Sequence, residues 1–201
     1  MSKVLLTVGG VPVYQDDDGS VHWTGELTID ADGCPHAYGP AGTEPLDNLA
    51  NAGYPGNWWG VVTTDSGQPY VQKKGQGAKA PWPGYHLSTT AYLVSGFGEY
   101  DARRYVDSEF VEFGVVPGNV RMSVPPKFMG CRMLITDNKT GESLECVCCD
   151  VGPSNHLGEA SMAVAEFFGL DPDPKVGGSS DRTRWHYRCW PGVASEDYPL
   201  Q

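Results

Sequence analysis

The sequence predicts a mainly β fold, in which short strands form a barrel and helix is a minor component. Glycine (26 residues) and proline (16 residues) make up about a fifth of the 201 residues, and this composition supplies many turns. Between these turn residues, short runs alternate apolar and polar side chains, which is typical of half-buried strands. Only one segment shows a clear helical stripe. Together these observations favour an all-β barrel with little helix.

The first part of the chain predicts three strands and a turn. Residues 4–8 are rich in β-branched side chains, and residues 11–15 and 21–29 alternate in polarity. Residues 30–33 read Asp-Ala-Asp-Gly, which resembles the opening of a calcium-binding loop. That pattern requires a bidentate glutamate at its twelfth position, and this position is Ala41. We therefore expect a tight turn, in which the aspartates accept hydrogen bonds from their own backbone.

The middle of the chain predicts one short helix and further strands. The helix would run from Pro45 to Gly53, where the glycine ends it. Further strands are expected at residues 58–64, 70–72, 85–94 and 110–117. Residues 73–84 are rich in glycine, lysine and proline, and we expect them to form a surface loop.

The second half predicts a hairpin, a helix and a last strand. In residues 131–149, two apolar runs flank Asn-Lys-Thr-Gly, which is a hairpin signal. Residues 159–168 place apolar side chains near a spacing of three to four residues, which predicts a helix. Residues 184–190 alternate again and predict a strand.

Charge and hydropathy limit the classes of partner. The net charge is −11 and the isoelectric point is about 4.7, so the chain has no electrostatic reason to bind nucleic acid or an anionic membrane. A cationic substrate is compatible with this charge. The N-terminus lacks the pattern of a secretory signal, and no segment approaches 18 apolar residues. We expect synthesis in the cytoplasm, with action there or after release by lysis, in a virion or by signal-less secretion.

The six cysteines predict buried free thiols. They lie at positions 34, 131, 146, 148, 149 and 189, and none of them forms a Cys-x-x-Cys pair or has a histidine at zinc-finger spacing. Cys146 and Cys148 would share one face of a strand and Cys149 would point to the other, which suits packing better than bridging. We expect no cofactor and no metal site.

Asp150 and Glu159 can be interpreted in two ways. Asp150 ends an apolar run and Glu159 stands in the first turn of the predicted helix, so they could be a turn residue and a helix-terminal acid. Alternatively they face one cleft as a general acid and a general base. The apolar run before Asp150 would then raise its pKa by desolvation, and backbone amides would keep Glu159 ionised. The sequence does not decide between these interpretations.

The segment Cys-Asp-Val-Gly-Pro-Ser-Asn-His-Leu-Gly-Glu-Ala-Ser, followed by an alanine-rich helix, resembles family 75 of the glycoside hydrolases, the chitosanases. Shorter similarities lie at residues 28–38, 105–117 and 175–178. The resemblance implies an inverting endo-hydrolase of β-1,4-linked glucosamine polymers, with a six-stranded double-psi β-barrel and one or two short helices. It maps the two catalytic carboxylates onto Asp150 and Glu159, with Asp150 as acid or with the roles exchanged.

The resemblance also implies a domain organisation. We expect one catalytic domain over residues 1–201, with an N-terminal β extension at 1–27, the chitosanase-like region at 28–192 and a tail at 193–201. Two other functions stay open. One is cleavage of peptidoglycan, whose β-1,4-linked amino sugars a phage lysin or virion-associated enzyme would cut. The other is a non-catalytic carbohydrate-binding or structural barrel. The oligomeric state is not determined.

Several other side chains are candidates for substrate binding. Flat aromatic faces on which a sugar ring could stack are offered by Trp58, Trp59, Tyr85 and Tyr92. Asp107 and its neighbour Glu109 could bind amino groups of the polymer. Asn155 and His156 lie inside the loop between the two carboxylates. The alternatives are core positions for the aromatic residues and a solvated loop for the acidic pair.

Overall fold

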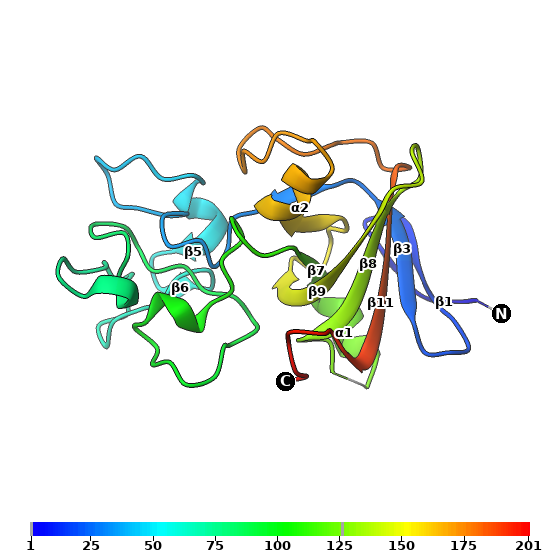
Figure 1. Cartoon of the computed structure of the whole chain (residues 1–201), viewed down its shortest axis with the longest axis horizontal. Helices are drawn as coiled ribbons and strands as arrows, with labels where there is room; N and C mark the ends of the chain where they lie inside the picture. Colours follow the sequence, from blue (N-terminus) through cyan, green and yellow to red (C-terminus); the bar gives the residue numbers. More distant parts are fainter. Residues whose placement is uncertain (1, 126) are drawn as a thin grey trace.

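The computed structural model describes residues 2–125 and 127–201, and it confirms a mainly β fold (Figure 1). Nine strands form one mixed sheet in the order β1-β2-β3-β11-β8-β9-β7-β10-β4. Their bounds are β1 Lys3–Val8, β2 Val11–Gln15, β3 Val21–Gly25, β4 Thr28–Asp30, β7 Phe113–Pro117, β8 Cys131–Asp137, β9 Ser143–Gly152, β10 Glu159–Ser161 and β11 Trp185–Ala194. The helices are α1 Gly118–Ser123 and α2 Met162–Phe167.

The sheet is larger and more open than the expected six-stranded barrel. The strand pairings leave β1 and β4 at its two edges, and among the described residues they do not close the sheet on itself. The expected N-terminal extension joins the same sheet, because β2 pairs with β3 in an antiparallel register. Two pairings are parallel, β7 with β9 and β4 with β10. Each of these parallel pairs brings together segments that are distant in the sequence.

Strands expected from local alternation are confirmed. β3, β8 and β11 bury every second side chain, as a sheet with one face on the core requires. Trp23 and Tyr187 stack in this core with ring centroids 5.6 Å apart, and Trp185 is fully buried beside them. The expected hairpin is also present, since β8 and β9 pair antiparallel around residues 138–142.

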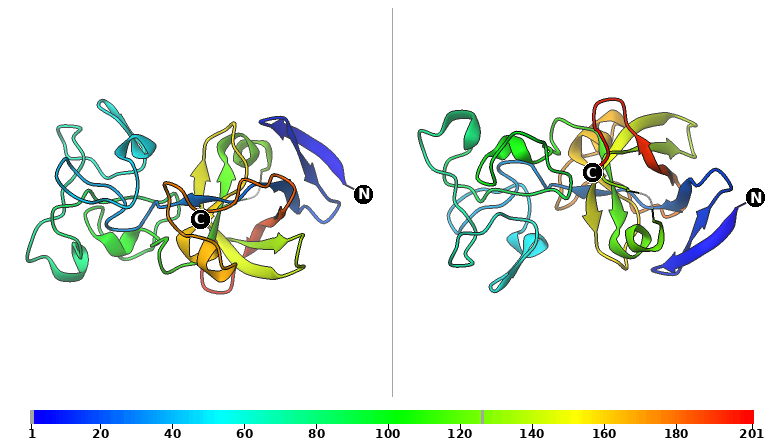
Figure 2. Two further views of the ribbon diagram at one scale, coloured as in Figure 1. Left: turned by 90° about the horizontal axis from the view of Figure 1, so that it is seen from above. Right: turned by 90° about the horizontal axis from the view of Figure 1, so that it is seen from below.

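The middle of the chain forms a loop-rich lobe beside the sheet (Figures 1 and 2). Its regular elements are short: η1 Leu49–Ala52, β5 Gly53–Tyr54, β6 Asn57–Trp58, η2 Gly77–Lys79 and η3 Ala102–Arg104. The strands expected at 58–64, 70–72 and 85–94 are wrong as continuous strands, because beyond β6 these segments make only isolated bridges such as Val61 with Ser88. The helix expected over 45–53 is reduced to the 3₁₀ turn η1.

The helix expected at residues 159–168 starts later and is shorter. Residues 159–161 pair in parallel with β4 and therefore extend as β10. Ser161 then caps α2, since its side chain accepts a hydrogen bond from the backbone of Val164. A partner strand that is distant in the sequence thus overrides the local helical pattern.

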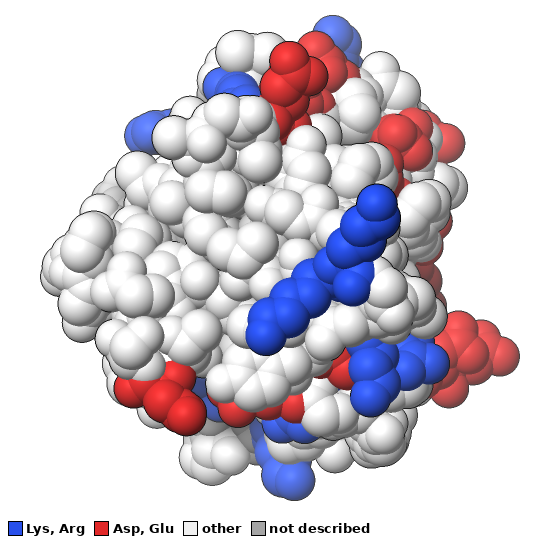
Figure 3. Space-filling model, turned by 90° about the vertical axis from the view of Figure 1, so that its left-hand side faces the viewer, with Lys and Arg blue, Asp and Glu red and all other residues white. Residues whose placement is uncertain are grey.

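All six cysteines are buried and free, as expected. No helix in the described part of the chain is long and apolar enough to span a bilayer. At the end of the loop-rich lobe, acidic side chains lie toward the rim of a largely uncharged surface, and basic side chains also extend across its middle (Figure 3). The negative charge of the protein is therefore not concentrated on this face.

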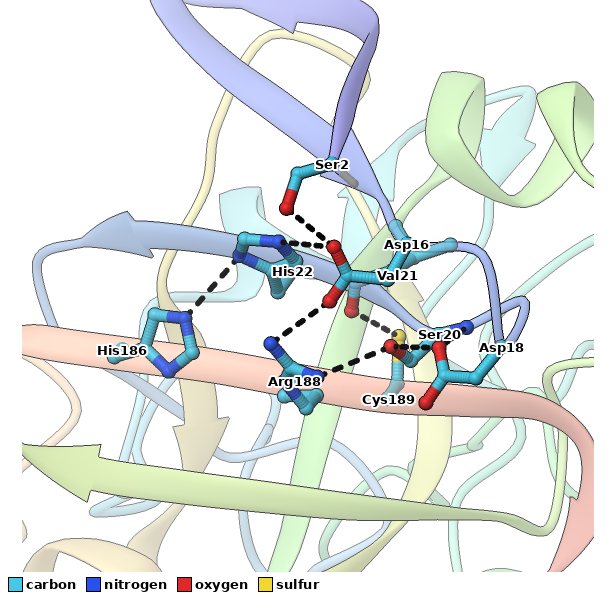
Figure 4. A network of polar contacts seen from close by, with 9 residues as sticks. All are labelled: Ser2, Asp16, Asp18, Ser20, Val21, His22, His186, Arg188 and Cys189. Atoms are coloured by element: carbon cyan, nitrogen blue, oxygen red, sulfur yellow. Dashed lines mark hydrogen bonds and ion pairs between the residues drawn. The ribbon is translucent and has the colours of Figure 1, made fainter.

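A polar network attaches the N-terminal hairpin to the sheet (Figure 4). The carboxylate of Asp16 accepts a hydrogen bond from Ser2 and lies 2.9 Å from the guanidinium of Arg188 on β11. His22 on β3 lies 3.5 Å from the same carboxylate. The hydrogen bond from Ser2, together with His22 and Arg188, lowers the pKa of Asp16. These contacts fix the edge hairpin on the sheet.

We expect replacement of Arg184 by alanine to destabilise the fold by about 2–3 kcal/mol. This is less than the cost of breaking a fully buried ion pair, because the guanidinium of Arg184 is partly exposed. Arg184 donates two hydrogen bonds of 2.9 and 2.8 Å to the buried carboxylate of Asp137 at the end of β8. This fork lowers the pKa of Asp137. Urea unfolding at neutral pH measures the loss. In the exposed pair of Arg132 with Glu145, replacement of Glu145 by glutamine should cost less than about 1 kcal/mol, and an equal cost in both variants would contradict the argument.

Candidate active site

An acidic cavity of about 550 Å³ opens where the sheet meets the loop-rich lobe. Its walls come from β4, β7, β9 and β10 and from residues 47–59. Carboxyl groups dominate the lining, and they are Asp30, Asp32, Asp47, Asp150 and Glu159. No lysine or arginine belongs to the lining among the described residues. A cavity of this size and charge can accommodate a segment of a cationic ligand.

Asp150 lies near the end of β9 with only 8% of its surface exposed. Its Oδ1 accepts hydrogen bonds from the backbone of Ala91, at 3.0 Å, and of Val151, at 2.7 Å. Burial and the nearby Asp30 raise the pKa of Asp150 well above its ordinary value, and the two amide donors oppose this shift. The direction agrees with the expected desolvation of this carboxyl group.

Glu159 is the first residue of β10 and lies opposite Thr28 in the parallel register. Its Oε2 lies over Gly152, so closely that a Cβ added to this glycine would stand 2.4 Å from it. Burial, Asp30 and Asp150 raise the pKa of Glu159 well above its ordinary value. The expectation that helix amides keep Glu159 ionised is therefore wrong, because the residue is in a strand. Asp150 is the carboxylate that backbone amides hold.

Asp30 and Asp32 are members of this cluster that the sequence analysis interprets only as turn residues. The turn exists, because Asp30 Oδ1 accepts from the backbone of Asp32 at 2.7 Å. Asp32 Oδ1 in addition accepts from the hydroxyl of Tyr38 at 2.7 Å. Burial raises the pKa of Asp30 to about 6, and burial together with Asp30 raises the pKa of Asp32 well above its usual range. The pairing of β4 with β10, which no local pattern indicates, brings both residues to Glu159.

Two groups of side chains have the donors and the spacing to hold a metal ion. Oxygen atoms of Asp30, Asp32 and Asp150 lie within 4.8 Å of one another, and such a set would suit a cation that prefers oxygen ligands. The second group, at Cys34, His36 and Glu109, lies outside the cavity lining. Clusters of carboxylates also occur without an ion, and the first group is equally suited to acid–base chemistry.

The other candidate residues are distributed around the molecule. Trp59 lines the cavity and is 56% exposed, whereas Trp58 packs partly buried against the core. Tyr85 belongs to an aromatic group with Trp82, and Tyr92 is buried. Asn155 and His156 line a separate small cavity of about 40 Å³, in which His156 lies 3.6 Å from Glu26. Asp107 lies close to Cys34. The structure thus brings Trp59 together with Asp150 and Glu159.

Comparison of the chain with protein-family models and with curated protein sequences gave no match.

Replacement of Asp30 by asparagine is expected to stabilise the protein at pH 7 by up to about 3 kcal/mol, the free energy of a shift from 3.8 to about 6. Between these values the folded state binds more protons than the unfolded state, so stability falls as the pH rises through this window. The gain from the asparagine should therefore be present at pH 7 and vanish below about pH 4. Chemical unfolding at several pH values measures it.

Asp181 supplies the control for this experiment, because it is exposed and hydrogen bonds from Thr183 lower its pKa. Its replacement by asparagine should give no gain at pH 7. If Asp30→Asn showed the same stability change at pH 4 and pH 7, the carboxyl group would not be buried as an unfavourable charge.

Proposed function

We propose that the protein is a glycoside hydrolase that cleaves β-1,4 linkages of an amino-sugar polymer, with chitosan as the first candidate. The observation that carries the proposal is that Asp150 and Glu159 line one open cavity with raised pKa values. Glycoside hydrolysis needs a carboxylic acid that protonates the leaving oxygen and a carboxylate that acts on the other face of the sugar. The similarity to family 75 of the glycoside hydrolases points to the same pair.

The hydrogen bonds favour Glu159 as the general acid and Asp150 as the general base. Asp150 accepts two backbone hydrogen bonds, which stabilise its ionised form. For Glu159, burial and the neighbouring carboxylates all raise the pKa, which favours its protonated form. Glu159 is therefore the better candidate for the group that donates the proton. This assignment exchanges the roles expected first from the sequence, with Asp150 as acid and Glu159 as base.

The position of Glu159 on β10 relative to Asp150 on β9 supports an inverting mechanism. Asp150 and Gly152 are two residues apart on one strand and so share a face, about 6.6 Å apart at 3.3 Å per residue. Glu159 Oε2 lies over Gly152. We therefore expect the carboxyl groups to be about 6–8 Å apart, which overlaps the range of roughly 6.5–9.5 Å that leaves room for a water molecule.

The surroundings suit a polymer that carries amino groups. Asp30, Asp32 and Asp47 add carboxyl groups to the cavity, and protonated glucosamine units would be attracted to those that are ionised. Trp59 at the same cavity presents an exposed aromatic face on which a sugar ring can stack. By the same resemblance, we propose that the inner strands correspond to a double-psi barrel core, and the parallel pairs β7–β9 and β4–β10 support this.

The test is to incubate the protein separately with chitosan and with purified peptidoglycan and to measure new reducing ends. Release from chitosan supports the proposal, and release from peptidoglycan alone identifies a cell-wall hydrolase with the same acid–base pair. If the protein binds either polymer but releases no reducing ends at all pH values tested between 4 and 8, it is instead a carbohydrate-binding module.

A further inference from the structure

A second cluster of reactive side chains lies behind the loop that carries Asp30 and Asp32. Cys34 Sγ is 3.3 Å from His36 Nδ1 and 3.9 Å from Glu109 Oε2. One donor atom from each of the three residues lies within 4.8 Å of the other two. The proposed hydrolase uses none of them, so the cluster calls for a separate explanation.

From this geometry we infer that Cys34, His36 and Glu109 form a binding site for a zinc ion. A thiolate, an imidazole and a carboxylate are the three kinds of ligand that zinc takes in proteins. With a Zn–S distance of about 2.3 Å and Zn–N or Zn–O distances of about 2.05 Å, tetrahedral ligands stand about 3.6 Å from the sulfur. The observed separations of 3.3 and 3.9 Å bracket this value. Small rotations of the side chains would complete the site.

Each of the three ligands is held by a contact of its own. A turn of backbone from Ala31 to Ala37 fixes Cys34, whose N–H donates to the carbonyl of Ala31. The ring of His36 stacks on Trp82 with 3.9 Å between centroids. Glu109 follows a turn in which its N–H donates to the Asp107 carboxylate. The site is therefore pre-formed, which reduces the entropic cost of binding an ion.

Charge and access also suit a divalent ion. A thiolate and a carboxylate with a neutral imidazole give a net charge of −2, which one zinc ion neutralises. A sulfur ligand disfavours magnesium and calcium, which prefer oxygen. Cys34 is fully buried, but Glu109 also lines a surface cavity of about 420 Å³ that offers a path for the ion. Water or the adjacent Asp107 could supply the fourth ligand.

The sequence contains a signal for this site that differs from the usual spacing. Cys34 and His36 are separated by a single proline, and Glu109 comes from a turn more than 70 residues away. The search for zinc-finger spacing therefore does not find it. An ion here would hold the 30–36 loop against the 107–111 turn, directly behind the acidic cavity.

Cobalt titration of the full-length protein, freed of metal by a chelator, tests the inference. Tetrahedral cobalt bound to a thiolate gives a near-ultraviolet charge-transfer band, and we expect one cobalt ion per chain, displaced by zinc. Cys34→Ser should abolish the band. Glu109→Gln changes a half-buried residue, so the fold should survive while metal affinity falls at least about tenfold.

Cys189→Ser is the matched control, because Cys189 is also buried and free and contacts the carbonyl of Val21. This variant should keep the band, and zinc should raise its melting temperature as it does for the wild type. The inference fails if cobalt gives no thiolate band, if the band persists in Cys34→Ser, or if Glu109→Gln binds cobalt as tightly as the wild type. Cobalt uptake without a thiolate band would place the metal among the carboxylates instead.

Discussion

Replacement of Glu159 by glutamine is expected to lower the rate of chitosan hydrolysis by about 10²–10⁴-fold, the usual contribution of a general acid or base. Glutamine has the shape of glutamate and can occupy the same space over Gly152. It has no proton of sufficient acidity to give to the leaving oxygen. Removal of a buried carboxyl group with a raised pKa also removes an unfavourable charge, so the variant should be at least as stable as the wild type.

Reducing-end release at several pH values, together with an unfolding curve, separates chemistry from folding. Glu142→Gln, in the exposed turn between β8 and β9, should retain the wild-type rate. Asp150→Asn should lose activity to a similar extent. Azide, a small anionic nucleophile that attacks the anomeric carbon in place of water, should restore chain cleavage only in this variant, which lacks the base. The product of this rescue is a glycosyl azide and not a reducing end, so it is measured as the azide adduct. A Glu159→Gln protein with more than a tenth of the wild-type rate would exclude Glu159 as the acid, and azide rescue of Glu159→Gln would exchange the roles.

Strands with one buried and one exposed face could be predicted from the sequence, even where the partner strand is distant, as for β3 and β11. In β3, β8 and β11 the alternation of apolar and polar side chains directly reflects one buried and one exposed face. The β8–β9 hairpin is predicted by the turn residues Asn-Lys-Thr-Gly at 138–141. The loop-rich lobe shows no such alternation. It is held together by contacts between segments apart in the sequence, such as the hydrogen bond from the Ser88 hydroxyl to the carbonyl of Gly60. Sequence patterns do not encode contacts of this kind.

The candidate site was predictable only in part for the same reason. Asp150 and Glu159 stand in one continuous motif, so residue chemistry and resemblance both single them out. Asp30 and Asp32 reach them through a parallel pairing across about 130 residues, and their turn-forming role fully explains their residue types. Cys34 and Glu109 are likewise brought together by the fold. The pairing of distant segments, rather than the chemistry of single residues, is what the sequence leaves undetermined.

The loop that carries both clusters depends on Gly33, and Gly33→Ala is expected to destabilise the protein by about 4 kcal/mol or more, in the range of exceptional single substitutions. Gly33 has φ +80°, a conformation that favours glycine. A Cβ at this position would stand 1.9 Å from the carbonyl oxygen of Val106 and 2.8 Å from Thr90. The nearest atom belongs to the backbone, so the whole loop from Asp32 to Cys34 would have to move.

Gly141 gives a matched control, because its φ is also +80° and an added Cβ would meet nothing within 4 Å. Gly141→Ala therefore reports the conformational cost alone, about 1–2 kcal/mol. Urea unfolding gives the loss of stability in each variant. The difference between the two losses is the cost of the contact between the added Cβ and the backbone of Val106. Since Gly33 stands between Asp32 and Cys34, its variant should also lose both chitosan hydrolysis and the cobalt–thiolate band. Equal destabilisation by the two alanines would mean that the loop is free to move away, and the geometry of both proposed sites would then lose its support.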